Sequence, residues 1–395
     1  MTLPDDVLRE LDDLLAPADA ALVAGWPGEP SARQPVHTLY LPADRASADV
    51  VTRVGADALD AVADQDAGSM ARITGLDPDL VDEVWPRVLA KLAREPIEDL
   101  RVDAEDGYRG DDEDADVLAA AAAVRADLDA GSAPPFVGIR AKSLEPATRR
   151  RGVRSLDLFL GRLAGSDREV LVTLPKVTDV HQVRAMVGLL AALEDAHGVP
   201  LALELQVETP QAVLGPDGTA TVAAMVHAAA GRCRGLHYGT YDYSAALGVA
   251  AAYQSSDHPV ADHAKAVMQV AAAGTGVRPV DGSSNLLPVG PRRDEAWRRH
   301  SELVTRALRT GLYQGWDLHP AQLPTRYLAT YCFFRDALPA ALDRLRAYLA
   351  GTETGVLDEP ATARALAAVV VRALDCGAAD PAEVGLDRPT LDRLR

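Results

Sequence analysis

The stretch LALELQVETP, residues 201–210, alternates aliphatic and polar side chains. Glu204, Gln206 and Glu208 occupy every second position, and aliphatic residues fill the positions between them. A period of two places the polar residues on one face of a strand and the aliphatic residues on the other. A carboxylate in an apolar interior neutralises or unfolds the chain unless a cation or hydrogen bonds meet it. We therefore expect a cation or hydrogen-bond donors opposite this strand.

The same stretch is one of eight short aliphatic runs that alternate with longer Ala-, Leu- and Arg-rich segments of helical period. Such alternation, repeated eight times, predicts an α/β fold with a closed parallel (β/α)8 or TIM barrel. The predicted strands begin at His37, Ile97, Pro135, Glu169, Leu201, Arg234, Thr275 and Trp316. The predicted helices between them cover residues 116–128, 153–163, 179–196, 219–230, 258–273 and 293–310.

Three segments extend the minimal barrel, which we assign to residues 37–325. Residues 1–36 form an N-terminal helical segment, and a helical insertion at about 65–95 follows the first strand, with a helix that begins at Asp77 or Pro78. Residues 326–395 are helical by pattern, with Gly377 ending the clearest helix, and are predicted to be a C-terminal cap or an oligomer arm.

Composition and charge exclude several classes of protein. The 395 residues are 48% hydrophobic and 25% charged, as in an ordinary globular protein. A net charge of −18 leaves no basic field for nucleic acid. The sequence has no long apolar run and an acidic start, so we expect no membrane span and a cytoplasmic location. The three cysteines are widely separated and are predicted to be reduced and structural.

Polar residues collect at the predicted C-terminal ends of the strands, where this architecture places its chemistry. They are Asp103, Glu105 and Asp106 after the second strand, Arg140 after the third, Lys176 after the fourth, Glu208 after the fifth, Asp242 after the sixth and His319 after the eighth. Glu208 and Asp242, on neighbouring strands, could share one Mg²⁺ ion, which prefers oxygen ligands. Alternatively, Glu208 caps a helix that starts at Pro210.

The other strand-end residues also have two interpretations each. Arg140 could bind a substrate carboxylate with both arms of its guanidinium, or it could pair with Asp103 and Glu105 inside the barrel. Lys176 could form a Schiff base, although the surrounding acids favour an ion pair. His319 could act as a general base or be structural.

Six motifs resemble, in order, those of the HpcH/HpaI aldolase/citrate lyase (citrate lyase beta subunit-like) superfamily. They are VDAEDGY, VGIRA, LPKV, VETPQAV, GLHYGTYDYSAALG and GWDLHPAQL, between Asp103 and Leu323. The resemblance implies a barrel of the phosphoenolpyruvate/pyruvate-binding type. It also implies Mg²⁺, with Mn²⁺ as a substitute, held by Glu208 and Asp242, and Arg140 holding the oxo-acid part of the substrate.

The activity that the resemblance implies is a carbon–carbon lyase (an aldehyde-lyase or oxo-acid-lyase, EC 4.1). It would cleave a hydroxy acid or its CoA ester through a metal-stabilised enolate. Arg140, Asp106 and Glu105 are the predicted catalytic residues, with Asp106 the candidate base; Arg140, Asp103, Lys176 and His319 are the predicted substrate-binding residues. The alternatives are a malate synthase-like acyl transferase or thioester hydrolase with the same metal site, and a metabolite-binding barrel without turnover.

Two departures from the family motifs bear on the substrate. AEDG stands where the family has LEDA, and the asparagine of the family's RVN strand is absent, because Lys142 follows Ala141. The basic residues 149–151 and Arg154 could meet CoA phosphates or could form a solvated helix start. By analogy with relatives, which are commonly trimers or hexamers, we expect a homo-oligomer.

Overall fold

The computed structural model describes residues 4–351 and 359–395, and its centre is a parallel barrel. Eight strands pair in the order β7-β6-β5-β4-β3-β2-β1-β8. A bridge between Asp281 and Gly315 brings the two edge strands together, so the predicted (β/α)8 barrel is confirmed. The strands are β1 (His37–Pro42), β2 (Asp99–Asp103), β3 (Phe136–Arg140), β4 (Val170–Leu174), β5 (Leu201–Val207), β6 (Cys233–Tyr238), β7 (Arg278–Val280) and β8 (Gly315–Asp317).

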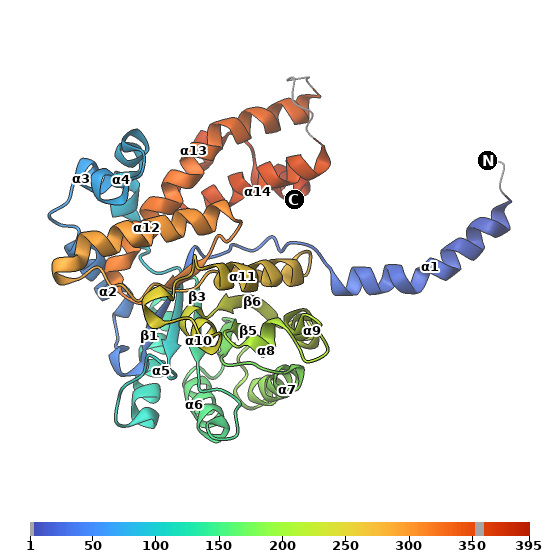
Figure 1. Ribbon diagram of the computed structural model, residues 1–395, viewed down its shortest axis with the longest axis horizontal. Helices are drawn as coiled ribbons and strands as arrows, with labels where there is room; N and C mark the ends of the chain where they lie inside the picture. The colour runs from blue at the N-terminus through green and yellow to red at the C-terminus, as the bar shows by residue number, and fades with distance from the viewer. Residues whose placement is uncertain (1–3, 352–358) are drawn as a thin grey trace.

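Helices surround the strands and extend beyond them (Figure 1). Those within the barrel and its insertion are α2 (Val50–Ala61), α3 (Ala67–Thr74), α4 (Pro78–Arg94), α5 (Glu113–Ala130), α6 (Arg149–Arg162), α7 (Val180–His197), α8 (Pro210–Val213), α9 (Thr221–Ala228), α10 (Thr240–Ala246), α11 (Pro259–Ala272) and α12 (Arg293–Arg309). The terminal helices are α1 (Asp5–Gly25), α13 (Leu323–Ala350), α14 (Pro360–Cys376), α15 (Pro381–Val384) and α16 (Arg388–Leu394). Short 3-10 turns are η1 (Ala43–Arg45), η2 (Ala251–Tyr253), η3 (Gly290–Arg292) and η4 (Pro320–Gln322).

The barrel interior contains the cation that the alternation in β5 led us to expect. Arg101, on β2, donates from Nη1 to Glu204 at 2.5 Å and from Nη2 to both oxygens of Asp99 at 3.0 and 2.9 Å. Thr173 donates to the same Glu204 oxygen at 3.1 Å. All four side chains are buried. The charge opposite Glu204 is therefore a guanidinium, a residue that we did not single out in the sequence.

The insertion and the C-terminal helices pack together on one side of the barrel. Asp77 accepts hydrogen bonds from the first turn of α4, and Pro78 is the first residue of that helix, as expected. Helix α13 contacts α4, α12 and α14. It begins at Leu323, before the boundary predicted at residue 326, because the turn η4 runs directly into it. Gly377, with φ +87°, ends α14.

The N-terminal helix α1 projects from the rest of the molecule (Figure 1). None of its residues is buried, and Leu14 and Val23 are each 74% exposed. The segment after α1 is held on the body of the protein, where Trp26 contacts the ring of His227 and Arg388 donates to the Ser31 carbonyl at 2.9 Å. The helix therefore extends from a fixed base.

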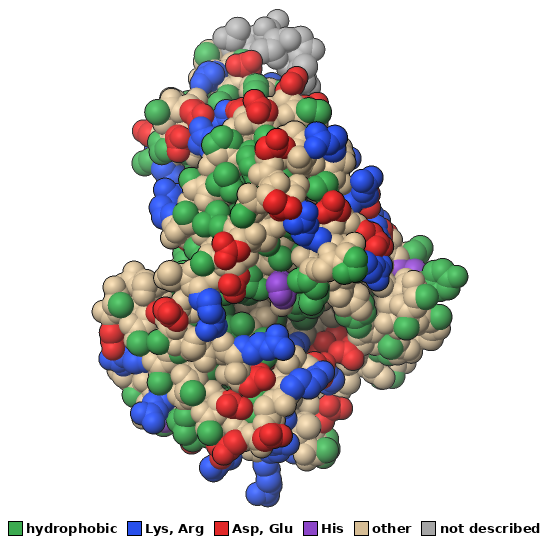
Figure 2. All heavy atoms as spheres, turned by 90° about the vertical axis from the view of Figure 1, so that its left-hand side faces the viewer, with side chains coloured by type: hydrophobic (Ala, Val, Ile, Leu, Met, Phe, Trp, Pro, Cys, Tyr) green, Lys and Arg blue, Asp and Glu red, His purple; other side chains and the backbone are tan. Residues whose placement is uncertain are grey.

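The described surface and the cysteines agree with the expectations from composition. Acidic and basic side chains are interspersed across the face shown in Figure 2. The three cysteines are free and buried. Over residues 4–351 and 359–395, none of the helices combines the length and the apolar character that crossing a membrane requires.

Candidate active site

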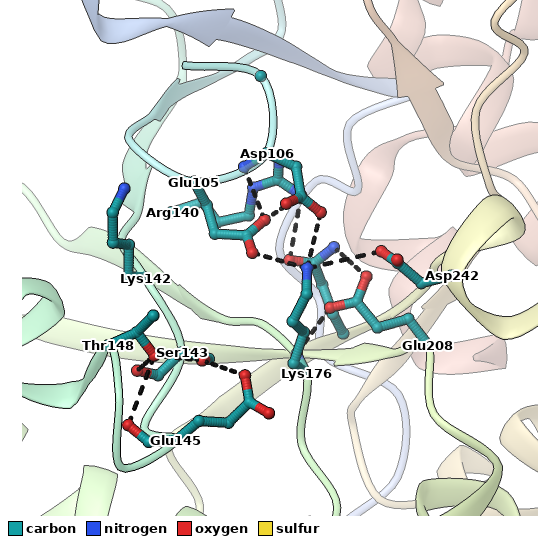
Figure 3. Close-up of polar contacts among 12 residues, drawn as sticks. Glu105, Asp106, Arg140, Lys142, Ser143, Glu145, Thr148, Lys176, Glu208 and Asp242 are labelled. Carbon is teal, nitrogen blue, oxygen red and sulfur yellow. Dashed lines mark hydrogen bonds and ion pairs between the residues drawn. The ribbon is translucent and has the colours of Figure 1, made fainter. Parts of the chain in front are cut away.

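The C-terminal ends of β2, β4, β5 and β6 bring four carboxylates around Lys176 (Figure 3). The Lys176 ammonium lies 2.7 Å from Glu105 and 2.7 Å from Asp106, and 3.6 Å from Asp242. The backbone N–H of Lys176 donates to Glu208 at 2.6 Å. Residues from four different strand ends, all singled out from the sequence, therefore meet in one cluster, which we call the carboxylate cluster: Glu105, Asp106, Glu208 and Asp242.

Lys176 has a left-handed backbone, with φ +52°. This conformation costs a non-glycine residue about 1–2 kcal/mol, so the surrounding contacts must hold it there. Burial alone would lower the pKa of Lys176, but the charges of Glu208 and Glu105 and the hydrogen bonds to Asp106 and Glu105 raise it above its usual value. The side chain stays an ammonium at neutral pH. Its contacts thus agree with the ion-pair interpretation and disfavour a Schiff base.

Glu208 is the most deeply buried member of the carboxylate cluster, with 3% exposure. Burial raises its pKa to about 8, although Lys176 and Arg140 act in the opposite direction. Gln206 donates to its second oxygen at 3.1 Å. The alternative role as a helix cap is not observed, because the side chain of Thr209 caps α8.

The backbone at the start of α10 passes directly over Glu208. A Cβ atom at Gly239 would clash with the side chain of Glu208. The glycine thereby allows β6 to deliver Asp242 to the same place. Asp242 is about half exposed, with 48% of its side chain accessible.

Arg140 points into the barrel mouth and is already engaged by protein groups. Its Nε and Nη2 donate to the two oxygens of Asp103 at 2.7 and 2.6 Å. Its Nη1 lies 3.4 Å from the Gln206 carbonyl and 3.6 Å from Glu105. The guanidinium stacks over the Tyr40 ring, with 4.8 Å to the ring centre. Only the Nη1 side of the fork faces the carboxylate cluster.

Asp103 lies beneath Arg140, and both of its carboxylate oxygens are engaged by protein donors. Its two oxygens also accept the backbone N–H groups of Glu105 and Gly107 at 3.0 and 2.9 Å. The carboxylate is buried and saturated by these donors. Asp103 thereby orients Arg140 and the turn that carries Glu105, and its contact with a substrate stays a prediction.

Glu105 and Asp106 differ in accessibility although they are adjacent. Burial raises the pKa of Glu105, whose side chain is 7% exposed. Asp106 is 55% exposed; burial opposes its ionisation, but the hydrogen bond and charge of Lys176 lower its pKa. Asp106 is therefore an ionised and accessible carboxylate at the mouth of the barrel.

His319 lies apart from the carboxylate cluster. Its Nδ1 accepts the backbone N–H of Ala321 at 3.1 Å and so caps the turn η4. The charges that act on it are Asp57 and Arg45, on α2 and η1. His319 thus has a structural contact, and its role in binding a substrate stays a prediction.

Reasoning from sequence missed Tyr40 and Trp316 as residues of the site, and it placed Gln206 on the polar face of its strand without assigning it a role. Tyr40 and Trp316 pack against each other, with ring centres 4.5 Å apart, and form the wall behind Arg140. Tyr40 alternates with Thr38 along β1, so the period of two could have placed it inside the barrel.

The fit of this site to a metal ion depends on Lys176. The described residues contain no group of three or more His, Cys, Asp or Glu side chains that could hold a metal ion. Mg²⁺ in proteins often takes only one or two carboxylates and completes its six ligands with water or substrate oxygens. Glu208 and Asp242, which interact electrostatically with each other, supply that number of hard oxygen ligands. The donor set therefore fits Mg²⁺, provided that the Lys176 ammonium leaves Asp242.

Comparison with solved structures shows that the chain shares its fold with a citrate lyase. The crystal structure of a citrate lyase from Burkholderia xenovorans LB400 aligns with a TM-score of 0.62 at 19% identity, over 90% of this chain and 99% of that chain. The Haloferax volcanii malate synthase magnesium/glyoxylate complex aligns at 14% identity over 75% of each chain, with a TM-score of 0.49. CitE from Mycobacterium tuberculosis, in complex with magnesium, acetoacetate and coenzyme A, aligns at 18% identity over 88% of this chain and 100% of that chain, also with a TM-score of 0.49. Because their TM-scores are below 0.5, the last two structures add no support to the assignment of the fold.

Within that fold, the chain belongs to the family described as a domain of unknown function, DUF6986, whose model matches residues 15–395. No curated protein matches the sequence. The family description assigns no activity, so a function has to be inferred from the site.

Proposed function

We propose that this chain is a Mg²⁺-dependent carbon–carbon lyase that cleaves a hydroxy acid or its CoA ester through a metal-stabilised enolate. The observation that carries the proposal is the convergence, at the C-terminal end of one barrel, of a buried guanidinium, two carboxylates suited to one cation and an exposed ionised carboxylate. Retro-aldol cleavage needs these three elements: an anchor for the oxo acid, positive charge for the enolate oxygen, and a proton acceptor.

Named residues would supply each of these three requirements. Arg140, held by Asp103 and stacked on Tyr40, presents Nη1 to the oxo-acid end of the substrate. Glu208 and Asp242 would hold Mg²⁺, or Mn²⁺ in its place, and the bound ion would supply fixed positive charge for the enolate oxygen. Asp106 accepts the proton of the substrate hydroxyl. Glu105, buried next to Asp106, holds the other side of the Lys176 ammonium.

Space for the rest of the substrate lies at the same end of the barrel. A pocket of about 450 Å³ is formed by the loops that follow β6 and β7. Its polar lining includes Tyr241, Ser283, Asn285 and Arg299. Tyr241 adjoins Asp242 in sequence, so a substrate anchored at Arg140 could extend into this pocket.

The test is metal-dependent product release. EDTA-treated protein is incubated with a panel of 2-hydroxy, 2-oxo and CoA-linked acids, with and without Mg²⁺, while pyruvate, glyoxylate, oxaloacetate and free CoA are measured. We expect an oxo acid only with metal, and its loss in Glu208→Gln. Glu169→Gln, at the opposite end of β4 in an exposed pair with Arg234, is the matched control. Free CoA without an oxo acid would instead identify a thioester hydrolase or an acyl transferase, and binding without turnover a metabolite-binding barrel.

We also propose that the chain forms a homo-oligomer through α1. The apolar side chains of α1 recur at helical spacing and are 44–74% exposed: Val7, Leu11, Leu14, Leu15, Leu22 and Val23. Most helical stability in proteins comes from packing of an apolar face, and α1 has no buried residues and a proline, Pro17, in its interior, which supports a second copy as its partner. Light scattering should give a multiple of the 41.8 kDa chain mass, and a smaller particle for Leu14→Asp. A monomeric wild-type protein would contradict the proposal.

A further inference from the structure

The cation within the carboxylate cluster is part of the chain. We propose that Lys176 is a tethered counter-cation: its ammonium neutralises the carboxylate cluster while no divalent ion is bound, and it opposes binding of that ion. This inference rests on the proposed metal site at Glu208 and Asp242. It adds that the protein itself limits how tightly the site holds metal.

The charges around the site give Lys176 this role. The carboxylate cluster has four acidic side chains, and like charges this close disfavour one another's ionised forms. Arg140 is the other cation nearby, but its two best-aligned donors are committed to Asp103. Lys176 alone contacts three of the four acids with its side chain and the fourth with its backbone. Removing its charge would leave the ionised members of the cluster without their main counter-charge.

The distances indicate which way the ammonium moves when an ion binds. It already has short contacts to Glu105 and Asp106, at 2.7 Å each, and a longer contact to Asp242, at 3.6 Å. An ion held between Asp242 and Glu208 would repel a neighbouring ammonium. The flexible side chain, 25% exposed, can turn towards Glu105 and Asp106 and give up only its weakest contact.

The backbone of Lys176 stays in place during this movement. Its N–H donates to Glu208, and its φ of +52° directs the side chain back over the mouth of the barrel. Glycine adopts this backbone without strain and lysine does not, so the contacts of the Lys176 N–H and ammonium must hold it there. One residue thus positions Glu208 through its backbone and competes for Asp242 through its side chain.

The inference is tested by Mn²⁺ binding, followed through the electron paramagnetic resonance signal of the free ion. Lys176→Met removes the ammonium and keeps a long side chain. We expect it to bind Mn²⁺ at least ~10-fold more tightly than the wild type, because a like charge a few ångströms from the ion is gone. Lys176→Gly, which also removes the unfavourable backbone conformation, should bind equally tightly, and it replaces Lys176→Met if that variant does not fold.

The matched control is Lys142→Met. Lys142 lies at the exit of β3, where its ammonium donates to the Ala104 carbonyl at 2.8 Å and does not contact the carboxylate cluster. The affinity of the Lys142→Met variant for Mn²⁺ should stay within about twofold of that of the wild type. Unchanged or weaker Mn²⁺ binding in both Lys176 variants would overturn the inference and leave the metal site standing. If neither the wild type nor Lys176→Met binds Mn²⁺, the metal site and this inference both fail.

Discussion

Replacing Arg101 by methionine should destabilise the protein more than any surface substitution. Arg101 is completely buried and is the cation between Asp99 and Glu204. Methionine keeps the aliphatic part of the arginine side chain, but it is shorter and has no charge and no donors. The change therefore leaves two buried carboxylates without their counter-ion.

The structure sets the size of the effect. Three hydrogen bonds to charged oxygens are lost, at 2.5, 2.9 and 3.0 Å. Removing one partner of a buried ion pair costs about 3–5 kcal/mol, because the remaining charge is not compensated. Burial opposes ionisation of Glu204, yet Arg101 and His237 lower its pKa below the ordinary 4.5. In the wild type this stability is present above pH 4.5 and is lost as the pH falls through the lower folded pKa.

Urea unfolding followed by circular dichroism measures the difference. We expect Arg101→Met to lose about 3–5 kcal/mol at neutral pH. The difference from the wild type should shrink below pH 4.5, where protonation of Glu204 in the unfolded chain destabilises the wild type. The control is Arg125→Met, which breaks an exposed pair with Asp129 and should cost less than ~1 kcal/mol. A loss for Arg101→Met as small as that of the control would refute the account of the barrel interior.

Three further outcomes are expected. His37 is fully buried, and burial lowers its pKa to about 4. Acidification from pH 6.5 towards pH 4 should therefore destabilise the wild type by up to ~3 kcal/mol more than His37→Gln in urea titrations. Equal losses of stability in the two proteins would show that His37 does not titrate. Gly239→Ala places a methyl group against Glu208 and should weaken Mn²⁺ binding at least ~10-fold. The control is Gly188→Ala on α7, where the new methyl group meets open space; it should stabilise the protein by ~0.5–1 kcal/mol and leave Mn²⁺ binding unchanged. Asp106→Asn should lower kcat of the cleavage reaction at least ~100-fold, measured at saturating Mn²⁺; an unchanged kcat would exclude Asp106 as the base.

Much of the barrel follows from the sequence because period and chain order are local signals. The alternation in residues 201–208 predicts both the strand and its polar inner face. Each predicted strand overlaps an observed one, and parallel pairing then brings their C-terminal ends to one mouth. This is why residues as distant as Asp106 and Asp242 could be expected together.

Partner choice is the part that the sequence leaves open, because it depends on register and side-chain reach. The spacing of Arg101 does not show that it crosses the barrel to Glu204, since that contact depends on the stagger between β2 and β5. Asp103 is next to the chemistry in sequence, but its carboxylate turns under Arg140. His319 follows its strand as expected, yet a cap on η4 uses its ring.

The most direct measurement is the initial rate of oxo-acid release, from the substrate that the panel identifies, as a function of Mg²⁺ concentration. We expect a rate that saturates with Mg²⁺ in the wild type, is abolished by EDTA, and is reduced at least ~100-fold in Glu208→Gln at saturating metal. Oxo-acid release that persists in EDTA, or a Glu208→Gln variant as active as the wild type, would contradict this expectation.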